Sequence, residues 1–369
     1  MSISDVKNDP AKVQLVRLAH VYFEHPDLET FARFAMDFGL VEVARKGNTI
    51  YFRGYGKDPY VYVASTGGKG KPQFLGPAFV ARDQENFDKA ARIPGAIVKD
   101  LDDAPGGGKM VTIPRPNDTF MHIIYGQKER DIDPTDAAVA SHSQGQFNTP
   151  FDKPRQNRSQ TCQEGPAVVH KLGHFGYVCK EFDEEVDFYT SNFNIIHSDI
   201  LWHPKLAGID VLTFMRLDLG KEYSDHHVMF LQRAPPEVKR TYLHHTSYEV
   251  ADFDTQLIGH DWLAKRGWKS VWGVGRHILG SQIFDYWQDS SGFKMEHYSD
   301  GDVVNEDSPT GRQVAGALSV WGPEIPKDFE LDGIDKYDKE LLPDARVHRH
   351  AGANKASSHK ITKHVEGPG

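Results

Sequence analysis

The chain has 369 residues, enough for two domains with sizeable cores. Its formal net charge is −9, from 43 Lys and Arg against 52 Asp and Glu, and no basic run compensates for it, which argues against a nucleic-acid partner. Apolar residues make up 39% of the sequence, as expected for an ordinary globular protein rather than a disordered one.

Targeting and redox features are few. No stretch approaches the roughly 18 apolar residues of a membrane span, and the N-terminal residues have no apolar run that could serve as a signal peptide. Cys162 and Cys179 form neither a disulfide framework nor a CxxC metal site. We therefore expect a cytoplasmic protein with no membrane partner. The 19 histidines are the notable excess, because histidine is the commonest metal ligand.

Four segments of the chain share one layout. They begin at Leu18, Leu75, Leu172 and Leu243, and each opens as a short strand, passes an acidic turn suited to helix capping, and continues at helical spacing. Strand-like runs such as "NTIYFRG" and "HHVMFLQ" follow the helices. The sequence therefore predicts an α+β fold of two domains, each built from a pair of βαβββ modules.

The predicted boundaries follow changes in composition. The N-terminal pair of modules covers residues 15–127, and the C-terminal pair covers residues 166–302. Residues 128–165 are polar and break every periodicity, which predicts a long connection between the halves. Residues 303–369 form a C-terminal extension, whose first part could pack back onto the body and whose polar end is expected to be mobile.

The segment "IFDYWQDSSGFKMEHY", residues 283–298, predicts a β-hairpin. If "SSG" is a three-residue loop with Gly292 in the left-handed conformation, Tyr286 lies directly opposite Glu296. Paired residues share a face of the sheet, so the phenol and the carboxylate would point into the same space. A carboxylate on a largely apolar strand pair needs a partner there.

The module repeat selects three candidate metal ligands. His174 and His245 each stand two positions after the leucine that opens their module, and Glu296 comes from the last strand of the fourth module. Two histidines and one carboxylate that leave positions open are the arrangement preferred by non-heme Fe(II) oxygen chemistry.

Each of these residues also has a simpler interpretation. A single strand histidine is more often a hydrogen-bonded core residue than a ligand, and Glu296 alone could pair with Lys294 or His297. Strand alternation does not favour His245 over His244; only the repeat register does so.

The N-terminal modules serve as an internal comparison. Aligning the repeats puts His20, Pro77 and Ile123 at the three ligand positions. One ligand in three cannot hold a metal ion, which predicts a metal-free N-terminal half.

Residues from about 15 to 305 resemble a type I extradiol ring-cleavage dioxygenase, of the catechol 2,3-dioxygenase kind, within the vicinal oxygen chelate superfamily. The matching motifs are "LGH" at 172, "HHVMF" at 226, "LHH" at 243, and "RH" at 276 followed by "DYWQDSSGFKMEHY". The chain departs from the usual bacterial pattern in its long central connection, its extended C-terminal tail, and a hairpin turn that lacks the usual proline.

The resemblance implies a set of roles around the metal. His226 would serve as the acid–base group that assists oxygen activation and proton transfer, and His277 and Tyr286 would hydrogen-bond the substrate hydroxyls. The simpler interpretations are a surface histidine in an acidic turn for His226 and an aromatic packing residue for Tyr286.

The reaction implied by the resemblance is extradiol cleavage of a catechol with O2 at Fe(II), and Mn(II) would fit the same ligands. We also expect a homo-oligomer. Two alternatives stay open: another metalloenzyme of the superfamily, such as a glyoxalase-like isomerase or a lyase, and a non-enzymatic ligand-binding protein of the same fold.

Overall fold

The computed structural model describes residues 3–67, 70–116, 119–132, 143–144, 147–206, 208–236, 238–327 and 329. Within these ranges, no helix is both long enough and apolar enough to cross a membrane. The predicted mobile end of the extension, from residue 330 onward, lies outside the described residues, as do residues 133–142 of the predicted connection.

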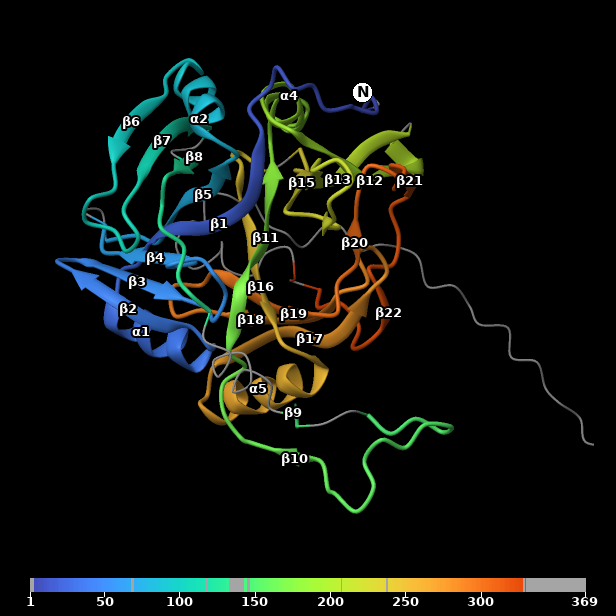
Figure 1. The fold of residues 1–369 in the computed structure, drawn as a ribbon. Coiled ribbons are helices and arrows are strands. Elements are labelled where there is room, and N and C mark those ends of the chain that lie inside the picture. Colours follow the sequence, from blue (N-terminus) through green and yellow to red (C-terminus); the bar gives the residue numbers. More distant parts are fainter. Residues whose placement is uncertain are drawn as a thin grey trace, which may run out of the picture.

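The N-terminal half is built from two βαβββ modules that form one eight-stranded sheet, in the order β2-β3-β4-β1-β5-β8-β7-β6 (Figure 1). The first module comprises β1 (Leu15–Glu24), α1 (Leu28–Asp37), β2 (Val41–Lys46), β3 (Thr49–Arg53) and β4 (Tyr62–Ser65). The second comprises β5 (Gln73–Ala81), α2 (Gln84–Ala91), β6 (Ile97–Asp100), β7 (Lys109–Arg115) and β8 (Thr119–Tyr125).

The C-terminal half repeats the arrangement in a ten-stranded sheet, in the order β21-β12-β13-β15-β11-β16-β19-β18-β17-β22. Its first module comprises β11 (Val169–Cys179), α4 (Phe182–Asn192), β12 (Ile195–His203), a short 3-10 turn η1 (Pro204–Leu206), β13 (Ile209–Leu217), β14 (Ser224–Asp225) and β15 (Met229–Arg233). Its second comprises β16 (Tyr242–Val250), α5 (Phe253–Lys265), β17 (Lys269–His277), β18 (Ile283–Gln288) and β19 (Lys294–Ser299). The predicted fold class of paired βαβββ modules is confirmed.

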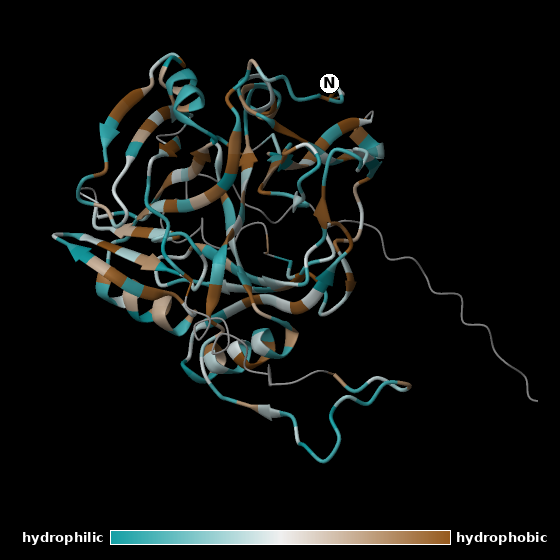
Figure 2. Ribbon diagram, in the orientation of Figure 1, coloured by the Kyte–Doolittle hydropathy of each residue, from teal (hydrophilic) through white to brown (hydrophobic). Residues whose placement is uncertain are grey.

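The connection and the start of the extension contribute short strands. In the connection, β9 (Ser143–Gln144) pairs with β10 (Thr161–Cys162), and this segment is mainly hydrophilic (Figure 2). In the extension, β20 (Val303–Val304) pairs with β14, while β21 (Gly311–Val314) and β22 (Ser319–Trp321) take the two edges of the C-terminal sheet. The first part of the extension therefore packs back onto the body.

Helix capping follows the predicted acidic turns in three of the four modules. Asp27, Asp83 and Asp252 each accept a hydrogen bond from the backbone N–H three residues later. This bond satisfies one of the amides that a helix start leaves without a partner. Helix α4 differs, because its N-cap residue Glu181 makes no such side-chain bond.

One hydrophobic core runs through both halves. It contains Phe23 and Phe79 of the N-terminal sheet together with Phe175 of the C-terminal sheet. The rings of Phe79 and Phe175 lie 6.2 Å apart, and Phe23 packs 4.8 Å from Phe293 of the second half. Strands β1 and β11 run next to each other where the sheets meet (Figure 1). This shared core holds the C-terminal sheet against the N-terminal sheet.

Asn194 is one of the buried polar links between the halves. It follows α4, is fully buried, and its side-chain oxygen accepts from the backbone N–H of Leu15 at 2.7 Å. Its side-chain amide donates to the carbonyls of Leu15 and Asp218 at 2.9 and 3.0 Å. Buried polar groups of the main chain need such partners.

Asn194→Ala should lower the free energy of unfolding by about 3 kcal/mol, because it leaves the buried N–H of Leu15 without an acceptor and removes further hydrogen bonds. Denaturant unfolding followed by circular dichroism measures this. Asn192→Ala is the matched control, since that side chain donates to the Phe188 carbonyl of its own helix and should change stability by less than about 1 kcal/mol. Equal effects of the two variants would contradict the proposed link.

Candidate metal centre

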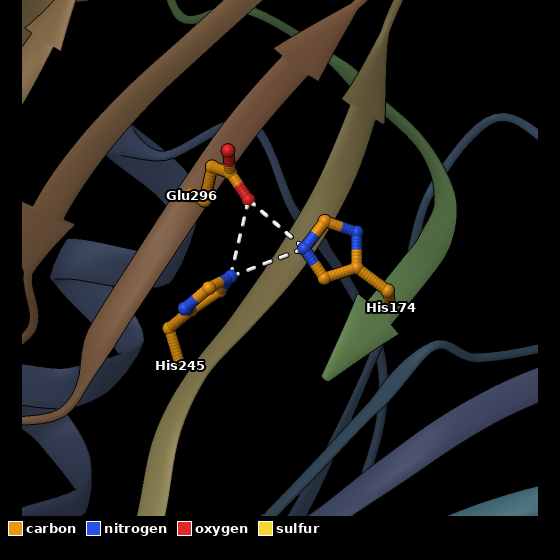
Figure 3. A group of neighbouring side chains, drawn as sticks. All are labelled: His174, His245 and Glu296. Carbon is orange, nitrogen blue, oxygen red and sulfur yellow. Dashed lines mark hydrogen bonds and ion pairs between the residues drawn. The ribbon is translucent and has the colours of Figure 1, made fainter. Parts of the chain in front are cut away.

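Three neighbouring strands bring the predicted metal ligands together. His174 lies on β11, His245 on β16 and Glu296 on β19, and β16 pairs with both of the other strands. In these ladders His245 faces Gly176, and Glu296 faces Ser247. The three side chains consequently leave one face of the sheet and converge, as Figure 3 shows.

The three ligand atoms form a small triangle. His174 Nε2 lies 3.1 Å from His245 Nε2. Glu296 Oε2 lies 3.2 Å from the first nitrogen and 3.3 Å from the second. All three residues are buried. Within the part of the chain that the structure describes, this is the one group of three or more histidine, cysteine, aspartate or glutamate side chains arranged to hold a metal ion.

The triangle fits one metal ion. Ligand atoms about 2.1 Å from a common ion and at right angles to each other lie roughly 3 Å apart. Both carboxylate oxygens of Glu296 are buried and make no conventional hydrogen bond in the structure. Buried carboxylates normally have such partners, and a cation at the centre of the triangle would supply one.

The electrostatics suit ligation as well. Burial is the largest effect on Glu296 and disfavours its charge, but the nearby imidazoles of His174, His245 and His277 together hold its pKa well below its usual range. Burial lowers the pKa of His245 well below its usual value, against the opposing effect of Glu296. Near neutral pH the site therefore offers a carboxylate and a neutral imidazole, the forms that bind metals.

The hairpin has the predicted register. Tyr286 on β18 pairs with Glu296 on β19. The loop is closed by a backbone hydrogen bond of 2.8 Å from Asp289 to Phe293, and Gly292 has a φ of 98°. That positive φ suits glycine, which lacks the Cβ that disfavours it.

Tyr286 is held by His277 at the edge of the site. The hydroxyl of Tyr286 lies 2.9 Å from His277 Nε2, and His277 Nδ1 lies 3.1 Å from the carbonyl of Leu318. A carbonyl only accepts, so in neutral His277 the Nδ1–H donates to Leu318 and Nε2 accepts from Tyr286. The returning extension thus sets the orientation of His277.

His244 contacts the metal ligand His245 and is not itself a corner of the triangle. Its Nδ1 lies 2.7 Å from Nδ1 of His245. When His245 offers Nε2 to a metal, its Nδ1–H is left to donate to His244. An imidazole in this place fixes the tautomer and ring orientation of the ligand, as outer partners of metal-bound histidines do.

The structure separates His226 from His227. His227 lines the cavity next to the triangle, with its ring 4.2 Å from that of His174, whereas His226 is not among the lining residues. Burial, followed by His174 and His226, lowers the pKa of His227 well below its usual value.

A hydrogen-bonded chain stands behind His227. Asp199 Oδ2 lies 2.8 Å from His226 Nε2, and His226 Nδ1 lies 3.1 Å from His227 Nδ1. The carboxylate accepts from His226, so neutral His226 accepts from His227 and leaves Nε2 of His227 with its lone pair. His227 was not among the residues predicted from the sequence.

The N-terminal half differs from the predicted alignment by one residue at two positions. In its ladders His20 pairs with Ala78, and Ala78 pairs with His122, just as His174 pairs with Ser247 and Ser247 with Glu296. The counterpart of Glu296 is therefore His122 rather than Ile123.

The same ladders give the remaining counterparts in the N-terminal half. Gly76, which pairs with Tyr22, is the counterpart of His245. The sequence alignment had predicted Pro77 at this position. Tyr22 itself stands where the second half has Gly176, and its ring lies 5.0 Å from His20 and 4.8 Å from His122. The tyrosine ring lies between the two histidines, where a metal ion would have to bind. This supports the prediction that the N-terminal half holds no metal.

No protein-family model matches the chain. A sequence relative, Metapyrocatechase 2 of Cupriavidus necator, is 26% identical over 314 residues, which cover 84% of this chain and 90% of the relative. Homoprotocatechuate 2,3-dioxygenase of Brevibacterium fuscum has a similar structure, with a TM-score of 0.69, 15% identity, and coverage of 88% of this chain and 94% of that one.

The chain is thus similar in sequence to a protein named as a metapyrocatechase and in fold to an extradiol ring-cleaving dioxygenase. Its fold is the vicinal oxygen chelate fold, and the Mn(II)-bound glyoxalase of Novosphingobium aromaticivorans shares it with a TM-score of 0.64, 19% identity, and coverage of 92% of this chain and 97% of that one. The resemblance and the fold predicted from the sequence are thereby confirmed.

Proposed function

We propose that this protein is an extradiol dioxygenase that cleaves a catechol with O2 at Fe(II) held by His174, His245 and Glu296. The observation that carries the proposal is the convergence of an open two-histidine, one-carboxylate triangle with His227, His277 and Tyr286 on one cavity. Mn(II) would fit the same ligands.

The metal, when bound, supplies a Lewis acid that polarises the catechol and O2 and holds them together. The ring opens between a hydroxylated carbon and its unhydroxylated neighbour, and both oxygen atoms of O2 enter the product. The reaction needs no external reductant, because the substrate provides all the electrons.

Tyr286 and His277 orient the substrate at this site. The Tyr286 hydroxyl donates to His277 Nε2, and its oxygen can accept a hydrogen bond from a catechol hydroxyl. Because Leu318 fixes the His277 ring, the position of the phenol is set before substrate arrives, which reduces the entropic cost of productive binding.

We assign the acid–base role to His227 in place of His226. His227 lines the cavity, and because its Nδ1 is bonded to His226, its Nε2 is left to take a substrate proton and return it later. The Asp199–His226 pair orients that imidazole from behind and stabilises it when it is protonated. The role that the resemblance suggested for His226 becomes one of positioning.

A glyoxalase-like isomerase is the second candidate, supported by the structural likeness to the Mn(II)-bound glyoxalase. An isomerase moves protons within its substrate and consumes no O2, so oxygen uptake separates the two functions. A non-enzymatic ligand-binding protein would need neither the metal triangle nor His227.

The test is oxygen uptake after anaerobic loading with Fe(II). The loaded protein should consume one O2 per catechol and form a coloured ring-opened product without added reductant, in a panel that includes alkyl, aryl and carboxylated catechols. Zn(II)-loaded protein is the control, since zinc has no redox chemistry. No uptake by fully iron- or manganese-loaded protein with any catechol would overturn the proposal.

The oligomeric state and the cellular location of the protein remain predictions. We expect a homo-oligomer in the cytoplasm that has no nucleic-acid or membrane partner. Ile97 and Val98 on the edge strand β6 are 65% and 50% exposed, and an assembly that covers this edge would remove apolar surface from water.

A further inference from the structure

A cavity of about 260 Å³ opens from the metal triangle into the C-terminal half. This volume is just below the roughly 300 Å³ at which pockets for drug-sized ligands start, and a single catechol ring is smaller than such a ligand. Whatever a catechol carries on its ring must fit the walls of this space, and those walls decide which substituents are accepted.

One wall comes from the first module of the half. Leu201 on β12, Leu212 and Phe214 on β13, and Phe230 on β15 all line the cavity. The Phe230 ring lies 5.2 Å from His245, and the Phe214 ring lies 4.8 Å from His227. Apolar side chains therefore begin directly beside the metal ligands and continue outward.

A second wall comes from β17 and the returning extension. Val314, Ala317, Leu318 and Phe329 line it together with Trp272 on β17. Phe329 is buried, and its ring lies 5.2 Å from Tyr286 and 5.1 Å from Trp272. A catechol ring with its oxygens at the metal would lie between two aromatic walls.

The cavity lining carries no permanent positive charge in the described part of the chain. Among the described residues, no lysine or arginine lines it, and its polar side chains beyond the metal end are the neutral amides of Gln232, Gln282 and Gln313. A nearby buried cation is Lys294, whose Nζ donates to the backbone carbonyl of Phe329 and lies 4.3 Å from the centre of that ring. Phe329 thus stands between this ammonium group and the cavity.

We propose that the cavity selects catechols with an uncharged, apolar alkyl or aryl substituent and rejects those with a carboxylate. This inference rests on the proposed function and names its substrate class. Moving a carboxylate from water into an apolar space without a cation is strongly unfavourable, whereas an apolar substituent gains by leaving water. The structurally similar homoprotocatechuate 2,3-dioxygenase has been captured with 3,4-dihydroxyphenylacetate, a carboxylated catechol.

Matched substrate pairs test the inference at two ring positions. One pair is 4-propylcatechol and 3,4-dihydroxyphenylacetate; the other is 3-phenylcatechol and 2,3-dihydroxybenzoate. We expect kcat/KM of the Fe(II)-loaded protein to be at least about 100-fold higher for the neutral member of at least one pair. Anaerobic calorimetry on the loaded protein should show the same order of dissociation constants.

Calorimetry measures binding without turnover, so it distinguishes a failure of the cavity's selectivity from a failure of the proposed dioxygenase activity. If no catechol is turned over but the neutral members bind more tightly, the dioxygenase proposal fails and the selectivity of the cavity stands. Equal or tighter binding of the carboxylated member in both pairs overturns the selectivity, whatever the turnover.

A charge inserted at the cavity mouth provides a second test. Gln313 is exposed and lines the cavity, so Gln313→Arg should fold normally and shift the preference toward the carboxylated catechols by about tenfold or more. Gln84→Arg adds the same charge on exposed α2 of the N-terminal half and is the control. No shift in Gln313→Arg, or equal shifts in both variants, would contradict a cavity governed by missing positive charge.

Discussion

His245→Ala should lose its Fe(II), whereas His244→Ala should keep it. His245 Nε2 is one corner of the ligand triangle, so its removal leaves two ligands. His244 lies against the far nitrogen of His245 and is not a corner of the triangle, and loss of such an outer partner weakens metal binding by roughly 10–100-fold. We expect the loss in His245→Ala to exceed that range clearly.

Metal analysis after anaerobic loading and desalting measures this contrast. The unaltered chain should bind one ion, and circular dichroism shows whether each variant is folded. Glu296→Gln, which keeps the side-chain volume and removes the charge, should also lose the ion. Retention in His245→Ala with loss in His244→Ala would mean that the ligand register is shifted by one residue. Two tightly bound ions per chain would contradict the metal-free N-terminal half.

The hairpin register and the position of His245 beside His174 and Glu296 were predictable because each depends on a regular feature. A three-residue loop with Gly292 in the left-handed conformation allows one pairing, which sets Tyr286 opposite Glu296. The repeated strand start distinguishes His245 from its neighbour, although both are buried histidines. Local rules of strand pairing were sufficient for these residues.

His227 could not be found in this way, because the chain is irregular where it lies. Phe230 and Gln232 line the cavity from β15, and strict alternation backward from them reaches His226. The strand begins only at Met229, however, so the alternation does not extend to the two histidines. Which of them faces the metal end depends on a bend that sequence patterns do not encode.

The same limit explains the shifted alignment of the N-terminal half and the missed cavity walls. Phe74 pairs with Phe23 in the first half, as Leu243 pairs with Tyr177 in the second. The second module therefore begins one residue before the predicted Leu75, and counting from Leu75 is off by one. Leu318 and Phe329 reach the site from the returning extension. Contacts between such distant segments depend on tertiary packing and leave no local periodicity.

His227→Ala should lower kcat by roughly 10²–10⁴-fold, the range for a lost acid–base group. Its Nε2 is the uncommitted imidazole nitrogen next to the metal end of the cavity. Metal content should stay at one ion per chain, because His227 is not part of the ligand triangle. KM should change less than kcat, since the metal and Tyr286 provide most of the grip on the catechol oxygens.

His226→Asn is the informative partner of that variant. This substitution removes the hydrogen bond between residue 226 and Asp199 but keeps a polar group beside His227. The His227 ring should therefore remain in the cavity wall but be less firmly oriented. We expect kcat to fall by about tenfold, and Asp199→Asn should have an effect of similar size, because both act through His227. Measuring kcat, KM and bound iron for all three variants decides between the two histidines. Full kcat in His227→Ala together with a loss of 10² or more in His226→Asn would return the acid–base role to His226.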